Sequence, residues 1–144
     1  TVVIPDTELH KMFLQGRYCP MQQEDAIIRT AAMYRILDSA GINIIRVGLK
    51  SSDIINGKNM QAGTFHPAFR QLVEGKIAQE DLDIQLRGCK PNTSVCCVSH
   101  PDSFNNMIGH KAVNKKYFSS AYPDLRISYK ADGNMRKGTY SIKF

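Results

Sequence analysis

Apolar and polar positions along the first half of the chain repeat in a strand, helix, strand order. The opening run TVVIP is β-branched and ends at proline, so it predicts a short buried strand. Apolar residues at helical spacing predict a short helix over residues 6–16 and a longer one over 22–39, closed by Gly41. The mainly apolar run INIIRVGL, residues 42–49, predicts a second strand. This order favours a right-handed parallel crossover, the βαβ unit of α/β folds.

A polar loop, residues 50–62, follows the second predicted strand. After it, AGTFHPAF introduces a new helix, because Pro67 fits a first helical turn and an apolar stripe follows it. We expect this helix to fade near Gly75 or soon after it.

The second half predicts a small β-β-α-β-β module. Residues 84–88 and 94–100 predict two strands around a turn, and a helix is expected from residue 102 or 103 to 121. The alternating runs 125–131 and 138–144 predict two half-exposed strands joined by a turn. We therefore expect an α/β chain with two domains: a parallel βαβ remnant in residues 1–83 and the β-β-α-β-β module in residues 84–144.

Charge is distributed unevenly between these two parts. The chain of 144 residues has a net charge of +6, but residues 84–144 hold 10 Lys/Arg against 3 Asp/Glu, whereas residues 1–83 hold 9 against 10. A basic half indicates an anionic partner, although solubility alone also explains it. No apolar run is long enough for a membrane span and no signal peptide is recognisable, so we expect a cytoplasmic protein without membrane contact. The chain starts within an apolar run and without Met, which indicates a fragment of a longer protein.

The four cysteines predict no metal site. Cys19 is remote from Cys89, Cys96 and Cys97, and no CxxC pair occurs. Adjacent Cys96 and Cys97 would point to opposite faces of a strand, which prevents joint chelation. The pattern is typical of scattered thiols in a reduced protein.

The strongest substrate-proximal candidates flank the polar loop. His66 and Thr64 stand at a helix start, where backbone amides favour an anion, and Lys50, Ser51 and Asp53 follow the second predicted strand. Ligands of α/β sheets gather at such strand ends. The alternatives are that His66 and Thr64 only cap the helix and that the other three lie in a solvated loop. No motif for a catalytic nucleophile or a phosphate-binding loop is present, so no catalytic residue is predicted.

Nucleic-acid candidates lie in the basic half. They are His110, Lys111, Lys115 and Lys116 on the predicted helix, and Arg126 and Lys130 on the following strand. Clustered cations can neutralise phosphates, and Tyr129 or Tyr140 can stack on bases. A solvated basic face is the alternative.

Several stretches resemble a radical S-adenosylmethionine family. TVVIPDTELHKMFLQGRYCP, INIIRVGLKSSD and AGTFHPAFRQLVEGKI are similar to the end of the catalytic barrel and its C-terminal extension in the Elongator catalytic subunit and in bacterial proteins labelled oxygen-independent coproporphyrinogen III oxidase. The family pattern T-x-L...M-Y...G-x-Y-x-P is matched from Thr7 to Pro20, with Phe13 in place of Tyr. The stretch GHKA also resembles a KH-type G-x-x-G helix start, with Ala112 in place of the second glycine.

The resemblance implies a parent iron–sulfur enzyme in which a CxxxCxxC motif holds a [4Fe–4S] cluster and S-adenosylmethionine binds its open iron. This chain has no CxxxCxxC, so the cluster is expected upstream and the fragment alone is expected to be inactive. The first hypothesis is a non-catalytic C-terminal part that completes the upstream radical SAM barrel and helps to hold substrate. The alternatives are an RNA- or tRNA-binding module, which a tRNA-modifying parent would accommodate, and a structural or protein-interaction domain.

Overall fold

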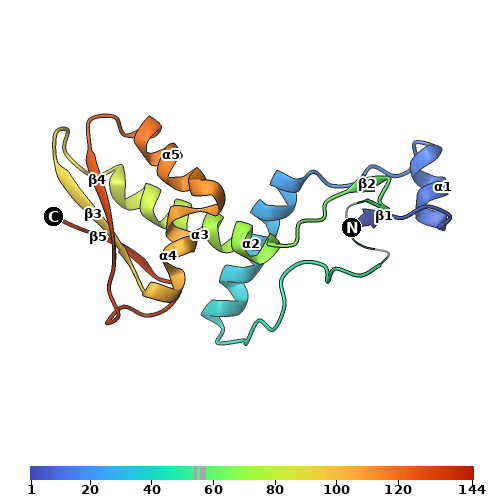
Figure 1. The fold of residues 1–144 in the computed structure, drawn as a ribbon, viewed down its shortest axis with the longest axis horizontal. Coiled ribbons are helices and arrows are strands. Elements are labelled where there is room, and N and C mark those ends of the chain that lie inside the picture. The colour runs from blue at the N-terminus through green and yellow to red at the C-terminus, as the bar shows by residue number, and fades with distance from the viewer. Residues whose placement is uncertain (54, 56–57) are drawn as a thin grey trace. The chain divides into compact units, whose positions relative to one another are not determined.

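The computed structural model describes residues 1–53, 55 and 58–144. They form two compact units, Thr1–Arg70 and Gln71–Phe144. Each unit contains helices and strands, which confirms the mixed α/β class (Figure 1). The functional division at residues 83 and 84 stays a prediction. Among the described helices, none is both long and apolar enough to cross a membrane.

The first unit contains the helices that its sequence predicts. They are α1 (Glu8–Leu14) and α2 (Gln23–Ser39). The hydroxyl of Thr7 accepts a hydrogen bond from the amide of His10 at 3.2 Å, which satisfies one free donor of the first turn of α1. Gly41 follows α2 with a φ of 70°, a left-handed conformation that suits the end of a helix.

The parallel strand pair predicted for this unit is not formed. Instead β1 (Val2–Val3) pairs antiparallel with β2 (Ala62–Gly63). Residues 42–49 carry no strand, and Ile42 and Ile45 are 53% and 87% exposed. An apolar run becomes a strand only when another strand supplies its hydrogen-bond partners, and the described residues of this unit supply none to this run.

The second unit packs helices against a three-stranded sheet. After α3 (Phe69–Leu86) come β3 (Ser94–Ser99), α4 (Phe104–Ile108), α5 (Val113–Ala121), β4 (Arg126–Ala131) and β5 (Tyr140–Lys143). The strand order is β4-β3-β5, with β3 parallel to β4 and antiparallel to β5. Figure 1 shows α3, α4 and α5 on the same side of this sheet. The core combines Leu82 and Leu86 of α3, Val95 and Cys97 of β3, and Met107 and Phe118 of the other two helices.

Two predictions for this unit are wrong in detail. No strand forms at residues 84–88, because residues 84–86 are the end of α3, and its buried Ile77, Leu82 and Leu86 continue the apolar stripe past Gly75. The single helix predicted up to residue 121 is broken at Gly109 into α4 and α5. The last two strands are formed as predicted, and they lie on the two sides of β3, each paired with it.

The outer edge of β5 is closed by a side chain rather than by another strand. The amide of Gln85 donates to the carbonyl of Tyr140 and accepts from the amide of Ile142, both at 3.1 Å. A side-chain amide thus occupies the place of a peptide group. This contact fixes the C-terminal part of α3 to the sheet and satisfies two edge groups.

Candidate functional site

A large cleft lies within the first unit. Its volume is about 1070 Å³, and α2, residues 44–49, residues 64–69 and the connector before α2 all contribute to it. Phe69 packs against Gly48, where an added Cβ would lie 2.9 Å from the Cβ of Phe69. The guanidinium of Arg70 donates to the carbonyl of Ile44 at 3.2 Å. These two contacts hold the segment 42–49 against the start of α3 and form one wall of the cleft.

Thr64 and His66, both predicted near a substrate, line this cleft. The hydroxyl of Thr64 donates to the carbonyl of Met21 at 3.1 Å, and Nδ1 of His66 accepts from the amide of Ala68 at 3.1 Å. His66 therefore has the local turn-capping role that was its alternative explanation. This hydrogen bond fixes the position of the imidazole ring in the wall of the cleft.

The other three substrate-proximal candidates are not brought into the cleft. Lys50, Ser51 and Asp53 are exposed and do not line it, although Leu49, directly before them, does. The backbone carbonyl of Asp53 accepts from the side-chain amide of Asn59 at 3.0 Å. The polar loop 50–62 to which they belong includes residues 54, 56 and 57, which lie outside the described residues.

Two cleft residues were missed by the sequence analysis. Arg29 of α2 and Arg46 of the segment 42–49 both line the cleft. Arg46 had a recognisable signal, since it interrupts an otherwise apolar run. Arg29 lies on a helix among ordinary polar positions, and only the three-dimensional arrangement joins the two.

A strained turn joins α4 to α5 in the second unit. Gly109 has φ 81° and ψ 155°, and Lys111 and Ala112 have φ of 53° and 60°. The side-chain amide nitrogen of Asn114, a residue only 2% exposed, lies 2.8, 3.2 and 3.3 Å from the carbonyls of Gly75, Asn106 and Met107. Ala112 thus adopts the left-handed conformation for which a second glycine would be suited, and buried Asn114 fixes the turn from within.

The predicted nucleic-acid residues divide into two groups. His110 and Lys111 lie in the turn, and Lys115 and Lys116 follow in α5. Arg126 and Lys130 alternate with Ile127 and Tyr129 along β4, so they share the opposite face of the sheet from these two.

Neither tyrosine proposed for base stacking is well placed. Tyr129 pairs in register with buried Cys97, and burial raises the pKa of its hydroxyl to about 12. Tyr140 is buried, with 8% of its surface exposed. Stacking by these rings is therefore not supported.

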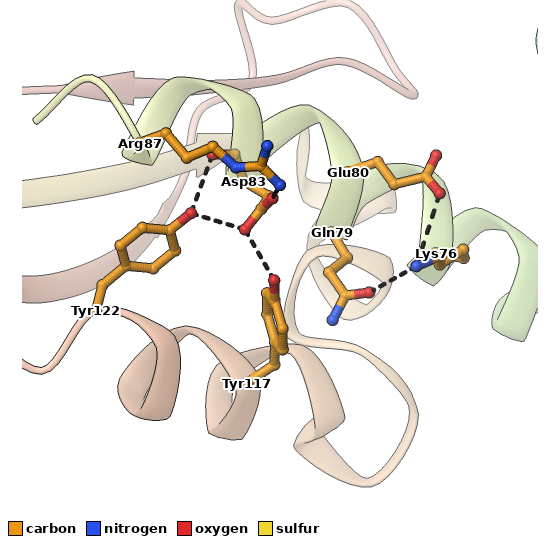
Figure 2. Close-up of polar contacts among 7 residues, drawn as sticks. All are labelled: Lys76, Gln79, Glu80, Asp83, Arg87, Tyr117 and Tyr122. Atoms are coloured by element: carbon orange, nitrogen blue, oxygen red, sulfur yellow. Dashed lines mark hydrogen bonds and ion pairs between the residues drawn. The ribbon is translucent and has the colours of Figure 1, made fainter.

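A polar cluster around Asp83 ties α3 to the end of α5 (Figure 2). Oδ1 of Asp83 accepts from the hydroxyls of Tyr117 and Tyr122 at 2.9 and 2.7 Å, and Oδ2 accepts from the guanidinium of Arg87. Burial acts to raise the pKa of Asp83, but the hydrogen bonds from Tyr122, Tyr117 and Arg87 lower it overall. Burial together with the bond to Asp83 raises the pKa of Tyr122 to about 12. These shifts move the carboxyl and the phenol away from neutral pH, so the cluster acts as an anchor rather than a proton-transfer site.

The cysteines do not fit the iron–sulfur cluster that the family resemblance implies. Within the described residues, no group of three or more His, Cys, Asp or Glu side chains is placed to hold a metal ion. Burial raises the pKa of Cys97 to about 12, and the neighbouring thiols of Cys96 and Cys89 add to the effect. A thiol held in its protonated form is a poor iron ligand.

Comparisons with known proteins support one assignment. The family model described as Radical_SAM C-terminal domain matches residues 1–79. Searches of curated proteins and of solved structures gave no match. The matched region includes the whole first unit, with its cleft, and the first part of α3.

Proposed function

Because this chain belongs to the family of radical SAM C-terminal domains, we propose that it is the C-terminal part of a radical S-adenosylmethionine iron–sulfur enzyme. In this proposal an upstream barrel of the parent protein holds the cluster, and the first unit completes that barrel at its substrate end. The parent is then an oxidoreductase similar to oxygen-independent coproporphyrinogen III oxidases or an RNA-modifying enzyme similar to the Elongator catalytic subunit. No step of that chemistry is assigned to residues of this chain.

One observation carries the proposal: residues 42–49 form a mainly apolar segment to which no other described residue is paired as a strand. Ile45 is 87% exposed, Ile42 53% and Leu49 45%, in a segment whose sequence predicts a buried strand. An exposed surface of this kind is typical of an interaction site. A neighbouring parallel strand of the barrel would pair its backbone groups and cover its side chains.

We expect the amides of residues 42–49 to exchange with solvent at least about tenfold more slowly in the full-length protein than in the 144-residue chain. Hydrogen–deuterium exchange read by mass spectrometry measures this, with β3 as the internal reference that should not change. Ile45→Asp should remove the added protection. Leu14→Asp is the matched control, because Leu14 is 71% exposed but lies on α1. Equal exchange in the two proteins would contradict barrel completion.

A second candidate function is RNA binding through the basic residues of the second unit. The turn at Gly109 and the lysines beside it favour this function. Lys111, Lys115 and Lys116 have no hydrogen-bond or ion-pair partner among the described residues, whereas Lys137 and Lys143 pair with Asp102 and Asp132. Cations that are held beside a rigid turn and lack acidic partners are available for phosphates. A substrate RNA would make this function compatible with the first.

Titration of the chain with labelled tRNA tests this candidate. We expect the affinity to fall steeply with salt, and Lys115→Ala with Lys116→Ala to reduce the slope of log K against log salt by about 2. The control exchanges Lys137 and Lys143 for Ala, which removes the same charge from residues that already have partners. Absence of binding at low salt, or equal losses in both double variants, would exclude these lysines as the RNA contact.

A further inference from the structure

We propose that the cleft of the first unit binds a small organic anion with an apolar body, whose acidic groups pair with Arg29 and Arg46. The inference deepens the proposed function and rests on it, because it names the class of substrate held at the barrel's open end. It concerns residues of the first unit alone.

The charge of the cleft selects for anions. Arg29 and Arg46 line it, His66 adds a third basic side chain, and no Asp or Glu of the described residues does so. Neither arginine has a hydrogen-bond or ion-pair partner within the described part of the chain. Elsewhere in the same unit, Lys11 is paired with Glu8 at 2.5 Å and Arg17 with Gln15 at 2.8 Å. The cleft therefore presents planar, permanently charged donors that are suited to a carboxylate or a phosphate.

The rest of the lining requires an apolar body. Met33, Leu37, Phe65 and Phe69 contribute carbon surface, and Tyr34 adds another ring. A volume of about 1070 Å³ is at the upper end of ordinary ligand pockets. A free inorganic anion would leave most of this surface in water, so the complementary ligand combines rings or aliphatic carbon with charge.

His66 and Thr64 belong to a wall of the cleft that local hydrogen bonds hold in place. Nδ1 of His66 accepts from the amide of Ala68, and the hydroxyl of Thr64 donates to the carbonyl of Met21. The cleft is therefore shaped before a ligand binds, as ligand pockets usually are. An apolar protein segment from elsewhere in the parent would fill only the apolar part of the cleft. Unless that segment also had acidic side chains, Arg29 and Arg46 would stay without acidic partners.

Two matched ligand pairs test the inference with the 144-residue chain and with the full-length protein. Adenosine 5′-monophosphate is compared with adenosine, and naphthalene-2-carboxylate with naphthalene-2-carboxamide, by NMR chemical-shift titration. The two pairs distinguish a phosphate-bearing ligand from a carboxylate-bearing one. We expect the anion of at least one pair to bind about tenfold more tightly than its neutral partner, as charge-assisted hydrogen bonds predict.

The double variant Arg29→Met, Arg46→Met should abolish that preference while the neutral ligands bind as before. Arg17→Met is the control, because Arg17 carries the same charge in the same unit but does not line the cleft. Equal binding of anion and neutral partner in the unmodified protein would overturn the inference, and so would a preference that survives in the double variant.

If residues 42–49 become protected in the full-length protein but neither anion binds, barrel completion stands and the anion site fails. Loss of anion binding in the full-length protein alone means that a parent segment fills the cleft, which also overturns the inference.

Discussion

Gly109→Ala is expected to destabilise the second unit by about 3 kcal/mol or more. With φ 81° and ψ 155°, Gly109 occupies a backbone region that side-chain-bearing residues enter only at a cost of about 1–3 kcal/mol. An added Cβ would also lie 2.8 Å from both the backbone nitrogen and Cγ of Asn114. Asn114 cannot withdraw without losing its contacts to Gly75, Asn106 and Met107, so strain and overpacking add.

Urea unfolding of the full chain, followed by amide exchange in β3 and α5, measures this loss. Gly133→Ala is the matched control, since Gly133 has no neighbouring atom within 4 Å of an added Cβ and no positive φ. We expect that variant to unfold at the same urea concentration as the unmodified chain. If Gly109→Ala also unfolded at the same urea concentration as the unmodified chain, the turn would be able to relax. It would then not be the rigid support for the lysines that the RNA-binding proposal requires.

Local signals made the two helices of the first unit predictable. Thr7 caps α1, and Gly41 follows α2, as capping and termination rules require. Local signals failed for residues 42–49. An apolar run indicates that a segment is buried, but it does not indicate which other segment covers it. The extension of α3 past Gly75 was missed for a related reason: a single glycine weakens a helix only slightly when buried leucines continue the stripe.

The candidate sites depended still more on long-range contacts. His66 and Thr64 could be found because a His-Pro helix start is visible in sequence, whereas only the three-dimensional fold places Arg29 and Arg46 in the lining of one cleft. Asp83 lies 34 and 39 residues from its tyrosine partners, so no local pattern marks it. Asp83 is only 7% exposed, and the sequence of α3 gives no reason for its burial. The reason becomes clear only when the packing of α3 with the end of α5 is known.

Asp83→Ala is expected to destabilise the second unit by about 2–4 kcal/mol, because hydrogen bonds to a charged group are worth about 1.5–3 kcal/mol each and two tyrosine hydroxyls would lose their acceptor. Tyr122→Phe, which removes one of these bonds, should cost less, about 1–3 kcal/mol. Tyr129→Phe is the control, since its hydroxyl has no hydrogen-bond partner among the described residues. Urea unfolding at pH 7 ranks the three variants, and an equal loss in both tyrosine variants would argue against the anchor.

The pH dependence of stability gives an independent test of the same anchor. The folded-state pKa of Asp83 lies below its ordinary value of 3.8, so the stability it contributes is present above that pH and is lost as pH falls through the folded-state pKa. Asp132, whose pKa is lowered mainly by its hydrogen bond from Lys143, contributes in the same direction. Unfolding free energies measured between pH 7 and pH 2 should therefore fall less steeply below pH 4 in Asp83→Ala than in the unmodified chain, and Asp132→Asn should remove a separate, smaller part. An acid limb unchanged by Asp83→Ala would mean that this carboxylate is bonded no better in the folded protein than in water.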